Sequence, residues 1–326
     1  MKVVFHGANA ALYAEGIEPL LGADCEIFRL PDVLQGEAQR ATFSAAEVMV
    51  SSSYNATLPP LPGLRLFQVP GAGIDGIDQA ALPAGVPLCN CYGHEVAIGE
   101  YVVAAMLRHV VPMNRADAEL RKGEWVYWSA HPDSLHGELA GRTLGLVGYG
   151  HIGRRIGALA DALGMRVIAA NRSPLPPEAP LAASYPLERL AEFCAAADFI
   201  VCSLPDLPQT RGLLGRDAFA AMRPSTVVIN VGRGPVIDEE ALYDALKSRR
   251  IAGAVIDTWY VYPPAGQFSQ TLPGHRPFQE LDNITMTPHM SGWTSGMVLR
   301  RRDTIVANVK NLATGRPLLN TVRAGR

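Results

Sequence analysis

The sequence has no long hydrophobic run and no strong bias of charge. Its 326 residues carry 29 Lys and Arg against 31 Asp and Glu, a formal charge of −2, so charge gives no reason to expect nucleic acid or a membrane surface as partner. No apolar stretch reaches the roughly 18 residues that span a bilayer. The first residues, Met1–Gly7, show neither the hydrophobic region nor the cleavage site of a secretory signal. We therefore expect a cytoplasmic protein.

Cysteine is scarce and is not grouped with other metal ligands. The chain has five cysteines and no C-x-x-C pair, and no cluster of histidines accompanies them. A metal site is therefore not expected. Free buried thiols in a reducing compartment explain the five residues best.

Short apolar runs alternate with helical stretches, which is typical of parallel α/β sheets. The first third predicts strands at Val3–Phe5, Glu26–Phe28, Val48–Val50, Leu66–Val69 and Leu88–Cys89. The second series predicts six strands at Thr143–Val147, Arg166–Ala169, Phe199–Cys202, Val227–Asn230, Ala254–Ile256 and Ile284–Thr287. Helices are predicted from Gly93 onward through Glu100–His109 and at Ile152–Leu163, Leu187–Ala196, Arg216–Met222, Glu239–Arg249 and Ser295–Leu312. Six strands with intervening helices make a complete dinucleotide-binding sheet. The proline-rich segment Arg172–Pro186 is predicted to be a loop, and the chain is predicted to end in a short polar tail.

A glycine-rich loop joins the strand Thr143–Val147 to the helix that follows it. Gly148 permits the tight turn, Gly150 lets the backbone approach a pyrophosphate, and Gly153 lets the helix pack on the strand. The start of the helix, at His151 and Ile152, offers free N–H groups and the positive end of the helix dipole. A strand, this loop and a helix in succession predict a dinucleotide site.

The end of the next strand bears on the choice of dinucleotide. An acid is expected there, about twenty residues past the glycines, when the ligand is NAD. This chain has Asn171, Arg172 and Ser173 instead. Asn171 does not repel a 2′-phosphate, and Arg172 with Ser173 offers it hydrogen bonds, which favours NADP. The alternative is that Asn171 binds the ribose hydroxyls of NAD while Arg172 stacks on the adenine.

Three later segments place candidate catalytic or binding residues at the ends of strands. Arg233 lies between two glycines after the strand Val227–Asn230, where its guanidinium can hold a carboxylate and polarise a carbonyl; helix capping or a pair with Asp238 is the structural alternative. His289 follows the last strand and can donate a proton as hydride arrives. Asp257 ends the strand between them and can accept a carboxamide N–H.

With these motifs, the chain resembles the D-2-hydroxyacid dehydrogenase family, which includes glyoxylate/hydroxypyruvate reductases, phosphoglycerate dehydrogenases and formate dehydrogenases. The resemblance covers nearly the whole chain. It implies two doubly wound α/β domains, a Rossmann cofactor domain at 95–289 and a smaller flavodoxin-like substrate domain built from 1–94 and 290–326. It also implies a homodimer that transfers hydride between NAD(P) and a small 2-oxo or 2-hydroxy acid.

The resemblance also assigns residues. Arg233 would orient the substrate, and His289 would be the acid and base. The backbone N–H groups of Ala72 and Gly73 would receive the substrate carboxylate. His94, Tyr54 and Trp293 are further candidates for the substrate site, although helix capping for His94 and wall packing for the other two are open alternatives. The remaining cofactor residues would be Ser203, Leu204, Pro205, Thr210, Val231, Gly232, Asp257 and Gly292.

One position departs from the family. A Glu is usual just before the proline of the Pro263-Pro264 segment, and this chain has Tyr262. A carboxylate beside His289 would raise the pKa of the imidazole, and a neutral phenol does so far less. We therefore expect His289 to be less basic than usual. Reduction at pH 7 and above would then be slow, or the preferred substrate would need less proton transfer.

Two alternatives to a glyoxylate- or hydroxypyruvate-type reductase remain open. Formate dehydrogenases also lack the Glu and carry a run similar to His289–Gly292, but His94 replaces their substrate-site Asn. A nucleotide-sensing protein with little turnover is the third reading, and the presence of both Arg233 and His289 weighs against it.

Overall fold

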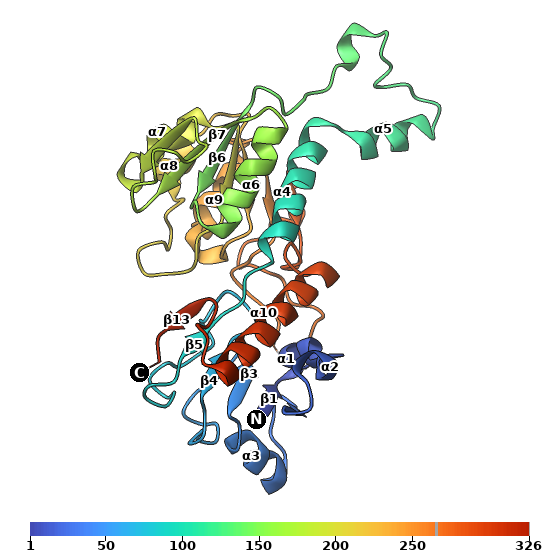
Figure 1. Ribbon diagram of the computed structural model, residues 1–326. Coiled ribbons are helices and arrows are strands. Elements are labelled where there is room, and N and C mark those ends of the chain that lie inside the picture. Colours follow the sequence, from blue (N-terminus) through green and yellow to red (C-terminus); the bar gives the residue numbers. More distant parts are fainter. Residues whose placement is uncertain (265–266, 326) are drawn as a thin grey trace. The chain divides into compact units, whose positions relative to one another are not determined.

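The computed structural model describes residues 1–264 and 267–325. The chain divides into two compact units (Figure 1). Unit 1 consists of Met1–His94 with Thr294–Arg326, and unit 2 is Glu95–Trp293. Each unit is an α/β sheet flanked by helices, as the alternating pattern predicts. The assignment of unit 1 to substrate and unit 2 to cofactor stays a prediction.

Unit 1 has a six-stranded sheet in the order β13-β5-β4-β3-β1-β2. The strands are β1 Lys2–His6, β2 Glu26–Leu30, β3 Val48–Ser51, β4 Leu66–Gln68, β5 Leu88–Cys89 and β13 Thr321–Arg323, and the helices are α1 Ala8–Ala14, α2 Glu18–Leu21, α3 Gly36–Ser44 and α10 Ser295–Thr314. The five parallel strands have the order 2-1-3-4-5 of flavodoxin-like sheets. Alternate residues of β1 enter opposite cores, since Val3 and Phe5 pack with α1 and α10, whereas Val4 packs with Phe43 of α3.

The C-terminal segment corrects one prediction. It is not simply a polar tail, because β13 pairs antiparallel with β5 through Thr321 and Cys89. Two of its three residues are exposed and the third is half-buried. The strand therefore has no run of buried apolar residues from which the sequence would predict it.

Unit 2 has a seven-stranded parallel sheet in the order β12-β11-β10-β9-β6-β7-β8. The strands are β6 Thr143–Val147, β7 Arg166–Asn171, β8 Ala183–Pro186, β9 Phe199–Cys202, β10 Val227–Asn230, β11 Gly253–Ile256 and β12 Ile284–Met286. The helices are α4 Glu95–Val110, α5 Met113–Leu120, α6 His151–Ala162, α7 Leu190–Ala196, α8 Arg216–Ala221 and α9 Glu239–Lys247. Without β12 the order is 3-2-1-4-5-6, that of the Rossmann fold. Helices α4 and α6 pack on one face of the sheet, and α7, α8 and α9 pack on the other.

Strand β8 corrects the prediction of a loop over Arg172–Pro186. It forms the edge of the sheet beside β7, with residues alternately half-buried and exposed. Proline is tolerated at such an edge, because no neighbouring strand needs its missing N–H.

Helix α4 begins at Glu95, which confirms the helix predicted from Gly93 onward. Its first turn is buried at Ala97 and Ile98. A Cβ at Gly99 would lie 2.9 Å from Leu159 Cδ1 on α6, so the two helices meet closely here. This packing stabilises the start of the helix.

Residues 111–142 leave the sheet of unit 2 and protrude from it (Figure 1). They include α5, which has no buried residue, and a 3-10 turn at Pro132–Ser134. Within the described residues no single helix has the length and apolarity to cross a membrane; α4 and α5, bent by 50° at the break between them, reach those limits only when joined.

Candidate active site

The predicted site residues of unit 2 lie at one edge of the sheet. The strand register aligns Val147 with Cys202, Asn230 with Cys202 and Ile256, and Ile256 with Met286. The residues that follow these strand ends therefore lie side by side. The carboxyl edge of such a sheet is where doubly wound folds bind their ligands.

The glycine-rich loop has the geometry that its sequence predicts. Gly148 adopts φ +95, and a Cβ there would lie 2.7 Å from Leu204 Cδ2. A Cβ at Gly153 would lie 2.3 Å from the carbonyl oxygen of Gly148. Gly150 differs, because nothing lies within 4 Å of its Cβ position. Gly150 is the N-cap of α6 and no side chain caps this helix, so the start of α6 borders open space where an anion fits.

The end of β7 is tied to this loop by Asn171. Its Oδ1 accepts the N–H of Tyr149 at 3.4 Å, and its Nδ2 donates to the Ser173 carbonyl at 2.9 Å. Arg172 and Ser173 are exposed beside it. The side chain of Asn171 thus shapes the turn, whereas Arg172 and Ser173 are open to a ligand.

The segment after β9 packs against the glycine-rich loop and against the turn that carries Arg233. The Ser203 hydroxyl donates to the Gly148 carbonyl at 3.3 Å, and a Cβ at Gly232 would lie 2.6 Å from the Leu204 carbonyl oxygen. Pro205 is exposed and Val231 is buried. Thr210 is buried, and its hydroxyl donates to the Pro205 carbonyl at 2.7 Å. Thr210 therefore holds this loop in shape through its hydroxyl.

The turn that carries Arg233 is held by Asn230. Its Oδ1 accepts the Gly232 N–H at 3.1 Å, and its Nδ2 donates to the Arg233 carbonyl at 3.1 Å. A Cβ at Gly234 would lie 2.3 Å from the carbonyl oxygen of Trp259, so this turn packs against the segment after β11. Asp238 serves as the N-cap of α9.

Asp257 is completely buried and organises the turn that contains His289. Its Oδ1 accepts from the Thr287 hydroxyl at 2.6 Å and the Met290 N–H at 2.8 Å, and its Oδ2 accepts from the Ser291 N–H at 2.9 Å. His289 has φ +57, which costs a residue with a side chain about 1–2 kcal/mol. Three hydrogen bonds to one carboxylate hold this unfavourable turn in place.

His289 faces Tyr262. The Tyr262 oxygen lies 3.0 Å from His289 Nδ1 and accepts the Trp259 N–H at 3.2 Å. The Trp259 indole donates to the Thr287 carbonyl at 2.8 Å. The structure therefore brings the segments after β10, β11 and β12 together around Arg233, Tyr262 and His289.

The electrostatics of this group match the expectation for His289. Partial burial lowers the pKa of His289 from its ordinary 6.5; the Asp257 carboxylate opposes this shift, and Arg233 adds to it. Burial raises the pKa of Tyr262, whereas the Trp259 N–H and Arg233 oppose this. The imidazole is thus held towards its neutral form beside a neutral phenol.

Unit 1 contains the other predicted substrate residues. The carbonyl of Gly71 accepts from the Cys91 N–H at 2.9 Å, and that of Ala72 accepts from Asn90 Nδ2 at 2.8 Å. These bonds fix the loop that carries Ala72 and Gly73.

Tyr54 is a correction. It is 3% exposed, packs with Phe43 and Phe67, and directs its hydroxyl to the Pro59 carbonyl. This is core packing, and we leave Tyr54 out of the proposed substrate site.

His94 and Trp293 lie on either side of the division between the units. His94 ends the first stretch of unit 1. Trp293 ends unit 2; its N–H donates to the Met290 carbonyl at 2.9 Å, and its side chain is exposed. Gly292 beside it is half-buried.

Sequence reasoning missed three residues that shape the site. Asn230 is the one polar residue of β10. A polar residue at the end of an apolar strand, close before a Gly-Arg-Gly turn, is a sequence signal that could have indicated its role in holding the turn. Trp259 acts through its backbone and indole N–H groups. Tyr101 lies in an apolar helix, and its oxygen is 2.7 Å from the hydroxyl of Thr287, in the turn that contains His289; the sequence holds no signal for this contact. Across residues 1–264 and 267–325 there is no group of three His, Cys, Asp or Glu that could hold a metal.

The family comparison matches the geometry. The model for the NAD-binding domain of D-isomer specific 2-hydroxyacid dehydrogenases matches residues 103–291. The hydroxypyruvate reductase of Thermotoga maritima is 33% identical over 235 residues, which are 71% of this chain and 72% of that protein.

The D-3-phosphoglycerate dehydrogenase of Methanocaldococcus jannaschii is 32% identical over 264 residues, which are 79% of this chain and 47% of that longer protein. The chain thus spans about half the length of this relative. Among solved structures, a D-isomer specific 2-hydroxyacid dehydrogenase of Xanthobacter autotrophicus Py2, in complex with NADPH and MES, is 26% identical with a TM-score of 0.77, covering 99% of this chain and 98% of that one.

Proposed function

The chain belongs to the D-isomer specific 2-hydroxyacid dehydrogenases, and from this premise we propose that it reduces a small 2-oxo acid with NADPH. The observation that carries the proposal is the position of Arg233, Tyr262 and His289 at the same sheet edge as the glycine-rich loop. The substrate class is that of a glyoxylate- or hydroxypyruvate-type reductase.

The residues of unit 2 fit a dinucleotide. The open space at the Cβ position of Gly150 and the uncapped start of α6 suit a pyrophosphate. Asp257 is completely buried, so its role in the proposed site is to hold the turn that contains His289. Reduced nicotinamide supplies the hydride when it is bound.

In the proposed reaction, Arg233 binds the substrate and His289 donates the proton. The guanidinium of Arg233 holds the substrate carboxylate with two hydrogen bonds and polarises the neighbouring carbonyl. His289 Nδ1 is engaged with Tyr262, so Nε2 is the atom that donates the proton to the carbonyl oxygen.

Burial lowers the pKa of His289, and Tyr262 adds no charge that would oppose this shift. The phenol shares a hydrogen bond with His289 but contributes no charge to favour the imidazolium. Only a small fraction of His289 is then protonated at neutral pH, and this fraction limits reduction of a ketone or aldehyde.

The preference for NADPH rests on the end of β7. Arg172 and Ser173 are exposed there, and no acid stands at position 171. The NADPH complex of the Xanthobacter autotrophicus protein is consistent with this choice.

A homodimer is part of the proposal. The protruding segment 111–142 carries Trp125 and Trp128, which are 67% and 54% exposed. Large exposed apolar side chains on an extended segment are typical of surfaces that a partner covers. A second copy of the chain is the partner that we propose.

Steady-state assays test the proposed function. Glyoxylate, hydroxypyruvate, pyruvate and phenylpyruvate are each offered with NADPH and with NADH, and formate is offered with the oxidised cofactors. We expect turnover of at least one 2-oxo acid, faster with NADPH. Turnover of formate alone, or cofactor binding measured by fluorescence without any turnover, contradicts the proposal.

A further inference from the structure

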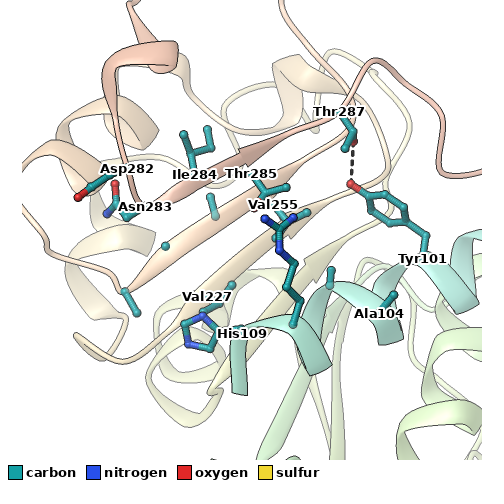
Figure 2. Close-up of a pocket in the computed structure, with 15 residues that line it drawn as sticks. Tyr101, Ala104, His109, Val227, Val255, Asp282, Asn283, Ile284, Thr285 and Thr287 are labelled. Atoms are coloured by element: carbon teal, nitrogen blue, oxygen red, sulfur yellow. Dashed lines mark hydrogen bonds between the residues drawn. The ribbon is translucent and has the colours of Figure 1, made fainter. Parts of the chain in front are cut away.

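A hydrogen-bonded chain leads from helix α4 to the turn that contains His289. Tyr101 projects from α4 towards the end of β12, and its oxygen lies 2.7 Å from the Thr287 hydroxyl (Figure 2). Both residues line a hollow of about 340 Å³ between α4 and strands β10, β11 and β12. Thr287 also lies 2.6 Å from Asp257 Oδ1, so three side chains from separate elements are linked.

The direction of these hydrogen bonds follows from chemistry. An ionised carboxylate only accepts, so the Thr287 hydroxyl donates its single proton to Asp257. The oxygen of Thr287 is then the acceptor for Tyr101, whose phenol donates. Burial raises the pKa of Tyr101, and the phenol therefore keeps the proton that this arrangement requires.

The chain ends at the backbone around His289. Asp257 accepts from the hydroxyl of Thr287 on one side of His289 and from the N–H groups of Met290 and Ser291 on the other. His289 itself has the left-handed backbone. Each donor that Asp257 loses weakens its hold on this turn.

We propose, on the basis of the proposed reductase function, that Tyr101 and Thr287 are positioning residues, which act through Asp257 to keep the imidazole of His289 directed at Tyr262 and at the substrate. Neither residue is required to touch substrate or cofactor. Their contribution is the angle at which His289 presents Nε2, to which proton transfer is sensitive.

Two substitutions remove single links of the chain. Tyr101→Phe deletes the first donor, and Thr287→Val deletes the hydroxyl with little change of volume. We expect kcat for 2-oxo acid reduction, measured at a pH low enough to protonate His289 in every variant, to fall on the order of tenfold in each, while the dissociation constant for NADPH changes less than about twofold. Thr287→Ser retains the hydroxyl and should restore most of the lost kcat.

Titration of His289 gives a readout that needs neither cofactor nor activity. The groups that act on this imidazole are Tyr262, Asp257 and Arg233. When the turn loosens, the ring becomes better solvated, and its pKa should rise towards 6.5. NMR of the histidine ring protons measures this pKa, and the resonance missing from His289→Asn identifies the residue.

Tyr243→Phe is the matched control. Tyr243 is a buried tyrosine of the same unit, packed against Phe278. Its substitution removes a phenol that is not part of the hydrogen-bonded series Tyr101–Thr287–Asp257. We expect both kcat and the pKa of His289 to stay unchanged in this variant.

Two results overturn the proposal. One is an unchanged kcat and an unchanged His289 pKa in Thr287→Val. The other is a fall of kcat that accompanies a lower Tm and weaker NADPH binding while the pKa stays fixed, which marks a merely structural role. If the unmodified chain reduces no 2-oxo acid, the proposed function fails, whereas the NMR titration still decides whether Tyr101 and Thr287 position His289.

Discussion

At the scale of single residues, the central proposal concerns Tyr262, which stands where the family resemblance implies a Glu. Tyr262 contacts His289 Nδ1 at 3.0 Å, so the imidazole keeps a hydrogen-bonding partner. It lacks a negative charge from that partner, and partial burial lowers the pKa of His289 below 6.5. The protonated form is the acid in reduction. Activity should therefore be high below this lowered pKa and fall as pH rises through it.

Tyr262→Glu should reverse this pH dependence. An adjacent carboxylate raises the pKa of an imidazole by about one unit or more, so the rate of 2-oxo acid reduction at pH 8 should rise about tenfold. The measurement is kcat against pH for the unmodified chain and the variant. Tyr262→Gln, which is neutral, is the control and should leave the midpoint low. A midpoint above about pH 8 in the unmodified chain contradicts the account.

Arg172 decides the choice of cofactor in the proposed site. Arg172→Ala removes a guanidinium from the place of the 2′-phosphate, and NADPH affinity should fall roughly tenfold or more, since charge-assisted hydrogen bonds to phosphate are strong. NADH affinity should not change. Arg166→Ala is the control, because Arg166 is equally exposed at the opposite end of β7. Equal losses for both cofactors in Arg172→Ala would place Arg172 outside the 2′-phosphate site. Fluorescence titration measures the affinities of the unmodified chain and of both variants for NADPH and NADH.

At the scale of elements, two glycines at the junction of β6 and α6 have different predicted roles: Gly150 leaves room for a ligand, and Gly153 allows close packing. Gly150→Ala adds a methyl group where nothing lies within 4 Å, so Tm should hold while the dissociation constant for NADPH rises about tenfold or more, because the methyl group meets the pyrophosphate. Gly153→Ala places a Cβ 2.3 Å from the Gly148 carbonyl oxygen, and this overpacking should cost about 1–3 kcal/mol of stability.

Thermal unfolding and NADPH titration of both glycine variants check this distinction. If Gly150→Ala binds NADPH as tightly as the unmodified chain, the pyrophosphate does not lie at the start of α6.

The buried strands and the glycine-rich loop could be predicted because their signals are local. Strands such as β6 and β10 are continuous apolar runs, and Gly148 and Gly153 stand where a close approach demands glycine. Edge strands could not be predicted in the same way. β8 and β13 are partly exposed, and each is completed by pairing with a strand distant from it in sequence.

The side-chain network was predictable only in part. Arg233 and His289 stand beside glycine and proline at strand ends, which marks them as candidates. The link from Tyr101 through Thr287 to Asp257 joins residues up to 186 positions apart. Such a link depends on how α4 packs on the sheet, and no local pattern records it.

At the scale of the whole molecule, the exposed tryptophans of segment 111–142 predict self-association. Gel filtration with light scattering should give twice the chain mass of 35.0 kDa. Trp125→Ala with Trp128→Ala should favour the monomer, since a central interface tryptophan contributes about 2 kcal/mol or more, roughly thirtyfold in dissociation constant. Phe268→Ala, which changes an exposed aromatic outside the segment, is the control. A monomer at micromolar concentration in the unmodified chain excludes the dimer.

The central claim is that Arg233 and His289 act together on one small acid beside a nicotinamide. The most direct measurement is a double-mutant cycle on kcat/KM for NADPH-dependent reduction of the best 2-oxo acid, with Arg233→Lys, His289→Asn and the double variant. We predict that each single substitution lowers kcat/KM about a hundredfold. The double variant should be little less active than the less active single variant, because the effects of groups that act as a unit are not additive. Fully additive losses, or a single variant with unchanged kcat/KM, would contradict the account.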